Sequence, residues 1–185
     1  SGPIALAAGG LANSFALNLF TVVDARSAAF FALGIAAATG KATIVVTTSG
    51  TAVGNLLPAA IEGDRSLHPI IFISADRPKR LKNCGANQTV NQEDFLRSVC
   101  RSFEEGPADG LHLLTAEALE DLVEKSWQKA HQFPGPVHVN LPLEEPLHAS
   151  VFDQEEVLSS WSEKNLSSDK YFFKSPVSFL NRSSL

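Results

Sequence analysis

The sequence has only two cysteines and no methionine among its 185 residues. Two thiols, Cys84 and Cys100, exclude a disulfide framework and a four-cysteine zinc site, and a reducing compartment is the default for such a chain. Charged residues are also scarce, at 19% of the chain against ~25% in average globular domains. So few charges favour a domain whose surface is partly covered by other protein.

Several function classes are excluded by further absences. The 15 basic and 20 acidic residues give a net charge of −5 without any basic block, which argues against a nucleic-acid surface. The longest apolar run, residues 28–38, is too short to span a membrane. No signal-peptide pattern is present. The chain does not begin with Met, and we interpret it as a fragment without its true N-terminus.

Short apolar runs predict strands, and Ala-rich or 3.6-periodic segments predict helices. The expected strands are residues 19–23, 42–47, 69–74 and 137–141. The expected helices are residues 4–11, 27–38 stopped by Gly40, 52–62 kinked at Pro58, 93–100, and 116–131 capped by Thr115, with Leu119, Leu122, Val123, Ser126 and Ala130 on one stripe.

The runs are continuous rather than alternating in hydrophobicity, which is typical of a parallel sheet buried on both faces. Their alternation with helices predicts an α/β fold, a doubly wound parallel sheet with helices on both faces. Residues 1–150 are expected to form this domain. Residues 151–185 lose the apolar period and contain nine serines, so we interpret them as a linker towards a domain that the sequence lacks.

Polar clusters follow three of the expected strands: residues 24–27, 48–51 and 74–78. Since the carboxyl ends of parallel strands meet at one edge, we expect the clusters to share a binding edge. Residues 49–51 either cap the next helix or offer donors to a ligand at its N-terminus. Arg77 either pairs locally with Asp76 or binds a substrate carboxylate in a bidentate pair.

A second candidate element is the loop Gly85-Ala86-Asn87-Gln88-Thr89, whose amides suit a substrate-orienting loop, although a polar surface turn is the alternative. Other motifs fail. Gly40-Lys41 lacks the upstream glycine of a phosphate loop, and no dinucleotide-binding glycine pattern exists. The five histidines have no metal spacing, and His138 is expected inside its strand.

These phrases resemble one family, the thiamine-diphosphate-dependent 2-succinyl-5-enolpyruvyl-6-hydroxy-3-cyclohexene-1-carboxylate synthases (MenD), over residues 1 to about 150. The resemblance is carried by Asp24-Ala25-Arg26-Ser27-Ala28-Ala29-Phe30, by residues 48–59 from Thr-Ser-Gly-Thr to Pro-Ala, by Ser74-Ala75-Asp76-Arg77-Pro78, by the 85–89 loop and by Gly135-Pro136-Val137-His138-Val139-Asn140.

The resemblance implies a pyrimidine-binding domain of an enzyme that decarboxylates 2-oxoglutarate on thiamine diphosphate and adds the succinyl carbanion equivalent to isochorismate. The pathway would be menaquinone or phylloquinone synthesis. The family's diphosphate and magnesium site lies on a later domain, so no metal site is expected here and the fragment alone should be inactive. The family also implies a homodimer or homotetramer, small-molecule substrates without nucleic acid, and a cytoplasmic location, or a plastid in a plant.

By position in the family, Arg77, Asn87 and Gln88 would bind substrate, and Ser49, Gly50 and Thr51 would line the pyrimidine. The family's Ser-Arg pair would precede Ser1. One departure concerns catalysis, because Ala25 stands where the family has the glutamate that bonds a pyrimidine nitrogen. A degenerate pseudo-enzyme domain, kept for dimerisation or regulation, is therefore the first alternative. An unrelated α/β ligand-binding module is the second.

Overall fold

The computed structural model describes residues 18–108 and 111–144, together with residues 150, 152, 155 and 159. The chain divides into two units, Ser1–His148 and Ala149–Leu185, and all the strands and helices named below belong to the first. The helix expected over residues 4–11 and all but three residues of the linker expected over 151–185 lie outside the described residues. The domain boundary at residue 150 stays a prediction.

The described residues form a four-stranded sheet in which every neighbouring pair is parallel. Its strands are β1 (Thr43–Thr47), β2 (Ile70–Asp76), β3 (Phe103–Glu105) and β4 (Pro136–Pro142), in the order β1-β2-β4-β3. The predicted parallel α/β fold is confirmed. The sequence did not indicate β3, because three residues are too few to show a pattern.

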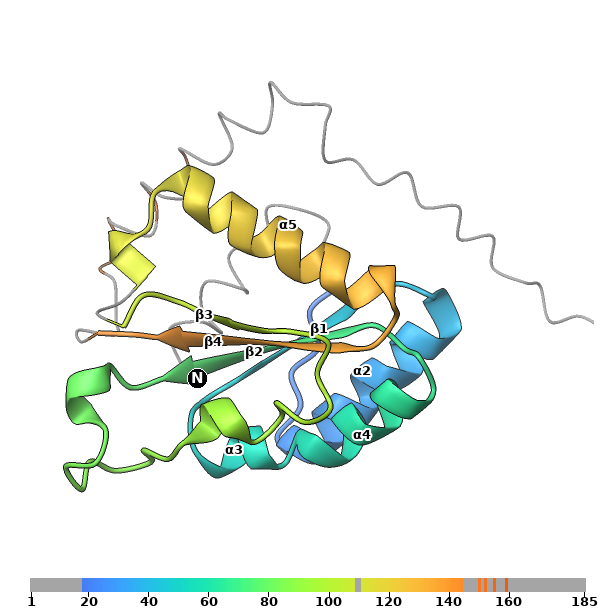
Figure 1. The fold of residues 1–185 in the computed structure, drawn as a ribbon, viewed down its shortest axis with the longest axis horizontal. Helices are drawn as coiled ribbons and strands as arrows, with labels where there is room; N and C mark the ends of the chain where they lie inside the picture. The colour runs from blue at the N-terminus through green and yellow to red at the C-terminus, as the bar shows by residue number, and fades with distance from the viewer. Residues whose placement is uncertain are drawn as a thin grey trace, which may run out of the picture. The chain divides into compact units, whose positions relative to one another are not determined.

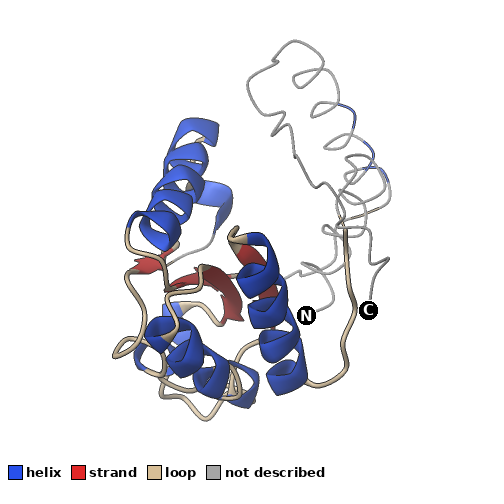
Figure 2. Ribbon diagram, turned by 90° about the vertical axis from the view of Figure 1, so that its right-hand side faces the viewer, coloured by secondary structure: helices blue, strands red, loops and turns tan. Residues whose placement is uncertain are grey.

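Helices cover both faces of the sheet (Figure 1). On one face α2 (Ala25–Thr39), α3 (Thr51–Gly54) and α4 (Leu57–Arg65) pack together, and on the other lies α5 (Ala116–Gln132). Figure 2 shows the same layers from the side. Each face has its own apolar core, one around Phe72 and Leu56 and one around Val137 and Ala130. No helix in the described part of the chain is long and apolar enough to cross a membrane.

The helix that precedes β1 follows from local sequence chemistry. Asp24 is the N-cap of α2, where its carboxylate accepts the backbone N–H of Ser27 at 2.8 Å. Gly40 ends the helix in the left-handed conformation, at φ 67°, which glycine adopts without steric cost. The inward positions are alanine with one leucine, and such small side chains bring α2 close to the sheet. The predicted helix and its stop at Gly40 are confirmed.

The helix predicted over residues 52–62 is interrupted rather than kinked. The chain leaves α3 at Asn55 and re-enters a helix at Leu57, with Pro58 in the first turn of α4. Proline has no N–H to donate and fits the first turn, where no intrahelical acceptor exists. Pro58 therefore starts a new helix instead of bending an existing one.

The strand predicted over residues 19–23 is wrong. These residues belong to no helix or strand, and Phe20 and Val23 are 59% and 105% exposed. A β-branched or aromatic run forms a strand only where a neighbour completes its backbone hydrogen bonds and covers its side chains. Among the described residues no strand pairs with this segment, and β1 pairs only with β2.

Two helix predictions need correction. Residues 93–100 form no α-helix; the segment has a 3-10 turn at Gln92–Asp94 and then further turns. Its inward side chains, Gln92 and Leu96, are fully buried, so burial rather than helix periodicity fixes the backbone. In α5 the Thr115 cap is confirmed, but two members of the predicted stripe, Leu119 and Val123, are exposed.

The N-terminal half of α5 lies farther from the sheet than its C-terminal half (Figure 1). A cavity of about 420 Å³ lies between that half and β3. The C-terminal half packs closely, and Ser126 and Ala130 are buried there. The apolar stripe therefore meets the sheet over only part of its length.

Candidate functional site

The polar clusters after β1 and β2 emerge at the same edge of the sheet. The two strands are parallel, with Thr47 opposite Ser74, so the residues that follow each strand lie side by side. The start of α2 is brought to the same end of the domain, because Arg26 Nη2 donates to Asn55 Oδ1 at 3.3 Å. The expected common edge is confirmed, although no strand leads into Asp24.

At the start of α2 the only carboxylate of the 24–27 cluster is occupied as a helix cap. Asp24 Oδ1 accepts both the backbone N–H and the hydroxyl of Ser27, at 2.8 and 2.7 Å. These hydrogen bonds lower the pKa of Asp24. Ala25 follows as the first helical residue and packs partly against the apolar core. Asp24 therefore does not replace an acid at position 25.

The Ser49–Thr51 turn depends on glycine at its centre. Gly50 has φ 81° and ψ −138°, a conformation essentially restricted to glycine. A Cβ atom here would lie 2.9 Å from Gln88 Cγ and 3.4 Å from Gln88 O. The backbone N–H of Gly50 donates to Gln92 Oε1 at 2.8 Å, so this donor is turned into the protein and is not offered to a ligand.

We expect Gly50→Ala to destabilise the 185-residue chain by ~1–3 kcal/mol, because the new methyl group meets Gln88 and the backbone is strained. Urea unfolding measures the change. Gly34→Ala is the matched control, since a Cβ at Gly34 in α2 meets nothing within 4 Å. That variant should gain ~0.5–1 kcal/mol from helix propensity. Equal stability of the two variants would contradict the described turn.

The loop that carries Asn87 and Gln88 folds back onto this turn. Gln88 Nε2 donates to Ser49 O at 2.9 Å and to Thr48 Oγ1 at 3.4 Å. Gln88 itself has φ 60°, and both Asn87 and Gln88 are exposed. The structure therefore joins a predicted substrate residue to the predicted cofactor turn, at the solvent-facing side of the edge.

Asp76 does not act as an isolated acid beside Arg77. Its Oδ1 accepts the backbone N–H of Arg77 at 2.8 Å, and its Oδ2 lies 2.7 Å from Lys82 Nζ. Lys82 also contacts Glu93 Oε2 at 2.8 Å. Burial opposes the charge on Lys82, but the hydrogen bonds to the two carboxylates raise its pKa. Through its contact with Asp76, Lys82 holds the 77–92 loop at the end of β2.

A chain of buried hydrogen bonds runs behind this edge from Asp76 to His138. Asp76 Oδ2 accepts from Asn140 Nδ2 at 2.8 Å, and Asn140 Oδ1 accepts from Ser74 Oγ at 2.9 Å. Ser74 Oγ, whose proton is used, must then accept from His138 Nε2, 2.7 Å away. The chain therefore assigns the proton of a neutral His138 to Nε2.

This tautomer leaves His138 Nδ1 as a buried acceptor, and the described part of the protein gives it no partner. Burial is the main cause that lowers the pKa of His138 to about 4; Arg97 adds to the effect, while Asp76 opposes it. His138 is fully buried and is a neutral member of the polar chain, as its predicted position inside a strand requires.

The low pKa of His138 predicts a pH dependence of stability. Between pH ~6.5, the ordinary histidine pKa, and about 4, the unfolded chain binds a proton that the folded chain does not. Stability should therefore fall as the pH falls through this window, by up to ~1.4 kcal/mol per pH unit from this residue. Urea unfolding of the 185-residue chain from pH 7 to 4 should show a shallower slope in His138→Gln. An unchanged slope would refute the neutral assignment.

Sequence reasoning placed Ser74 in the polar cluster at the end of its strand, but it missed Gln92, Asn140 and Lys82 as parts of this edge and did not predict the buried network. A usable signal was present, since Asn140 and Ser74 are polar residues inside otherwise apolar strands. Buried polar groups need partners, so such residues mark where a network must form. No pattern indicated that Gln92 would be the partner, because it lies in a loop.

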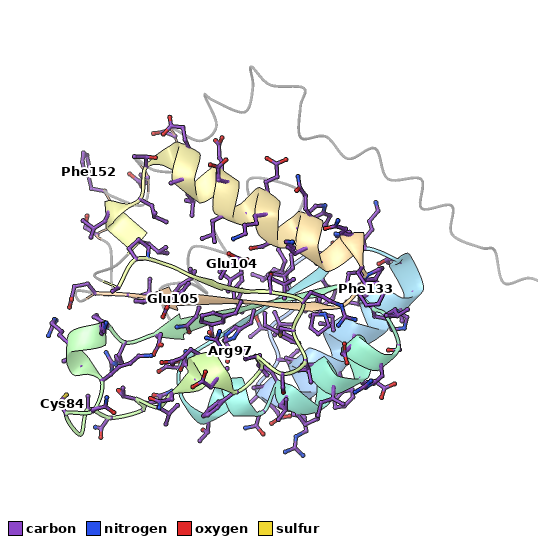
Figure 3. The ribbon with its side chains drawn as sticks, in the orientation of Figure 1. Cys84, Arg97, Glu104, Glu105, Phe133 and Phe152 are labelled. Atoms are coloured by element: carbon purple, nitrogen blue, oxygen red, sulfur yellow. The ribbon has the colours of Figure 1, made fainter. Side chains whose placement is uncertain are left out.

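The cavity beneath α5 contains none of the predicted site residues. It is lined by Glu104, Glu105, Asp121 and Lys125 among others, and Figure 3 labels Glu104 and Glu105 on β3 below the helix. Within the described residues no group of three His, Cys, Asp or Glu side chains could hold a metal ion. Cys84 lies at the outer part of the 77–92 loop (Figure 3), and burial raises the pKa of Cys100 to about 12.

Most of the residues at this edge lie in a segment that matches a known domain family. Residues 5–95 match the family described as thiamine pyrophosphate enzyme, N-terminal TPP binding domain. The match includes Ala25, the Gly50 turn and the loop with Gln88. Together with the parallel α/β fold, this match identifies residues 5–95 as similar to an N-terminal thiamine-pyrophosphate-binding domain.

Relatives that match most of this chain indicate which thiamine-dependent enzymes it resembles. The chain is 61% identical over 165 residues to the 2-succinyl-5-enolpyruvyl-6-hydroxy-3-cyclohexene-1-carboxylate synthase of Prochlorococcus marinus strain SARG, with 89% of the chain and 29% of the relative covered. The synthase of the same name from Synechococcus sp. strain WH7803 is 58% identical over 161 residues, with 87% and 28% covered. Over these matched residues the chain is similar to the MenD synthases, and the predicted resemblance to that family is confirmed.

The chain spans less than a third of the length of these relatives. The activity, substrates and partners of the whole synthase are therefore carried over only as proposals.

Proposed function

We propose that this domain forms the pyrimidine side of a MenD-type active site, in a synthase that joins 2-oxoglutarate, after loss of CO₂, to isochorismate for menaquinone or phylloquinone synthesis. The observation that supports this most directly is the meeting of Gln88 with the Ser49–Thr51 turn, at 2.9 Å from Gln88 Nε2 to Ser49 O. Residues proposed for substrate and for cofactor thus share one edge, in a domain that is 61% identical to such a synthase.

The residues at this edge suit the uncharged pyrimidine ring of thiamine diphosphate. Ser49 and Thr51 supply hydroxyls, and Gly50 keeps the backbone free of a side chain. When bound, the cofactor supplies the carbon centre at which 2-oxoglutarate loses CO₂. The residues suit proton transfer to the pyrimidine nitrogen less well. Ala25 has no carboxyl group to offer, and the carboxylate of Asp24 is held as a helix cap.

The substrate side of the proposal rests on Arg77, Asn87 and Gln88. Arg77 follows the end of β2 at the same edge, and its guanidinium suits a carboxylate because it can donate two parallel hydrogen bonds. Both 2-oxoglutarate and isochorismate carry carboxylates. Asn87 and Gln88 would contribute uncharged amides for the remaining oxygens, from a loop that Lys82 holds in place.

The remaining features of the proposal come from the family alone. They are a Mg²⁺ ion and the diphosphate held by another domain, a homodimer or homotetramer, and a cytoplasmic or plastid location.

The direct test is a chimera in which this chain replaces the matched segment of the Prochlorococcus synthase, which then supplies everything outside it. With Ala25→Glu introduced, the chimera should bind thiamine diphosphate and release CO₂ from 2-oxoglutarate only as far as isochorismate is consumed. A soluble, folded chimera that binds no thiamine diphosphate would overturn the proposal. The unaltered Prochlorococcus synthase is the positive control.

A second candidate function is favoured by Ala25 itself. A domain without the acid could persist as a pseudo-enzyme module for dimerisation or regulation. The chimera with Ala25 kept separates the two functions, because a pseudo-enzyme module would associate normally yet show no turnover, and Ala25→Glu would not restore it.

A further inference from the structure

The Ser49–Thr51 turn is held from inside the protein by a side chain that has no assigned role. Gln92 is fully buried, and its Oε1 accepts the backbone N–H of Gly50 at 2.8 Å. We propose that Gln92 is a positioning residue, which sets the geometry of this turn and thereby the affinity for the pyrimidine side of thiamine diphosphate. The proposal rests on the function proposed above.

The orientation of the Gln92 amide is fixed by its partners. The N–H of Gly50 can only donate, so the group facing it is the amide oxygen. The amide nitrogen faces two acceptors, Ala75 O at 2.9 Å and Asn140 Oδ1 at 2.8 Å. All three contacts are satisfied in one orientation only, and a flipped amide would oppose donor to donor and acceptor to acceptor.

The partners of Gln92 are themselves rigid. Ala75 lies in β2 and Asn140 in β4, the two central strands of the sheet. Asn140 is further fixed by Asp76, to which its Nδ2 donates. Gln92 therefore transmits the position of the sheet to the turn through one continuous set of hydrogen bonds.

The turn needs such a support because of its glycine. Gly50 is free to adopt many backbone conformations, and its φ of 81° is only one of them. From the solvent side Gln88 contacts Ser49 O, and from the protein side Gln92 contacts the next residue. Since Gln88 is exposed and Gln92 is buried, the buried contact is the one that a ligand would leave unchanged.

The test uses the chimera with Ala25→Glu as parent. Gln92→Met removes all polar contacts at nearly equal length, and Gln92→Glu keeps an oxygen towards Gly50. Gln128→Met is the matched control, because Gln128 is exposed on α5 and bonds only to Glu124 among the described side chains. Val137→Ala, in the core below α5, controls for lost stability without a change at the turn.

Three readouts are measured: amide hydrogen exchange of the segment containing Gly50, the Kd for thiamine diphosphate, and the KM for 2-oxoglutarate. We expect Gln92→Met to speed exchange and to raise the Kd by about tenfold each, the effect of one unmet buried hydrogen bond. The KM for 2-oxoglutarate should stay within about twofold. Gln92→Glu should recover part of the exchange protection, and the two controls should keep the parent values.

The outcomes separate this inference from the proposed function. If the parent binds thiamine diphosphate and Gln92→Met binds it equally well, Gln92 is merely structural and the inference is overturned. The same follows if exchange at Gly50 is unchanged, a result that needs no cofactor. If the parent binds no cofactor, the proposed function fails, and the affinity part of the inference fails with it. If Gln92→Met does not fold, Gln92→Glu decides by the same readouts.

Discussion

In the chimera, Ala25→Glu should raise the rate of C2 hydrogen–deuterium exchange of bound thiamine diphosphate by ~10²–10⁴-fold, the range that a positioned acid–base group supplies. The position favours the change. Residue 25 opens α2, and a carboxylate in the first turn of a helix interacts favourably with its dipole. Asp24 cannot supply the function already, because both its hydrogen bonds to Ser27 hold it as the cap.

The control is Ala25→Gln, which has the size of glutamate without its acid. It should bind the cofactor as the Glu variant does and leave exchange near the slow rate of Ala25. Hydrogen–deuterium exchange at C2 of the cofactor is followed by NMR after acid quench, and the Kd for thiamine diphosphate is measured separately. Fast exchange in the Ala25 chimera, or an equal gain from Gln and Glu, would show that the assignment of this position is wrong.

Arg77→Ala has the second-largest expected effect. A charge-assisted bidentate pair contributes ~1.5–3 kcal/mol, so kcat/KM for 2-oxoglutarate or isochorismate should fall roughly 10–150-fold in the Ala25→Glu chimera. The Kd for thiamine diphosphate should change little, because the residues proposed for the pyrimidine lie after β1 and not after β2. Steady-state kinetics with each substrate varied in turn measures the loss.

Arg80→Ala is the matched control for Arg77. Arg80 lies three residues further along the same loop, and its guanidinium pairs with Glu144. Removing an exposed ion pair typically costs less than ~1 kcal/mol, so both kcat/KM values should remain near those of the parent. If Arg77→Ala behaves like Arg80→Ala, Arg77 has only a local structural role.

Much of the fold and the common edge of the polar clusters could be predicted, because these features depend on residues that lie close together in the sequence. Gly40 and Thr115 mark helix ends through the backbone chemistry of their own neighbourhoods, and the apolar runs from Thr43 and from Ile70 predicted two strands. β2 is buried as expected, whereas Ile44 and Val46 of the edge strand β1 are exposed. Parallel strands bring their carboxyl ends together, so the common edge followed without knowledge of any contact. The motifs at that edge also sufficed for the family.

Other parts could not be predicted because they depend on residues far apart in the sequence. The run at residues 19–23 has strand-like composition, yet strand formation requires a neighbour that the sequence pattern cannot guarantee. Lys82 was an ordinary loop lysine until the fold placed it 2.7 Å from Asp76 and 2.8 Å from Glu93. Leu119 has the right helical period, yet it is exposed, since burial depends on which side of α5 the fold turns towards the sheet.

The sequence by itself determined the parallel α/β class, the common edge of the polar clusters, the resemblance to the family, and the lack of an acid at position 25, because each depends on residue identity or on short-range geometry. The tertiary structure alone decided that Gln92, 42 residues away along the chain, holds Gly50. It also decided that Asp76, Asn140, Ser74 and His138 form one buried chain. These contacts form because β2 and β4 are neighbours in the sheet. A buried polar group bonds to whichever partner the fold brings within hydrogen-bond distance.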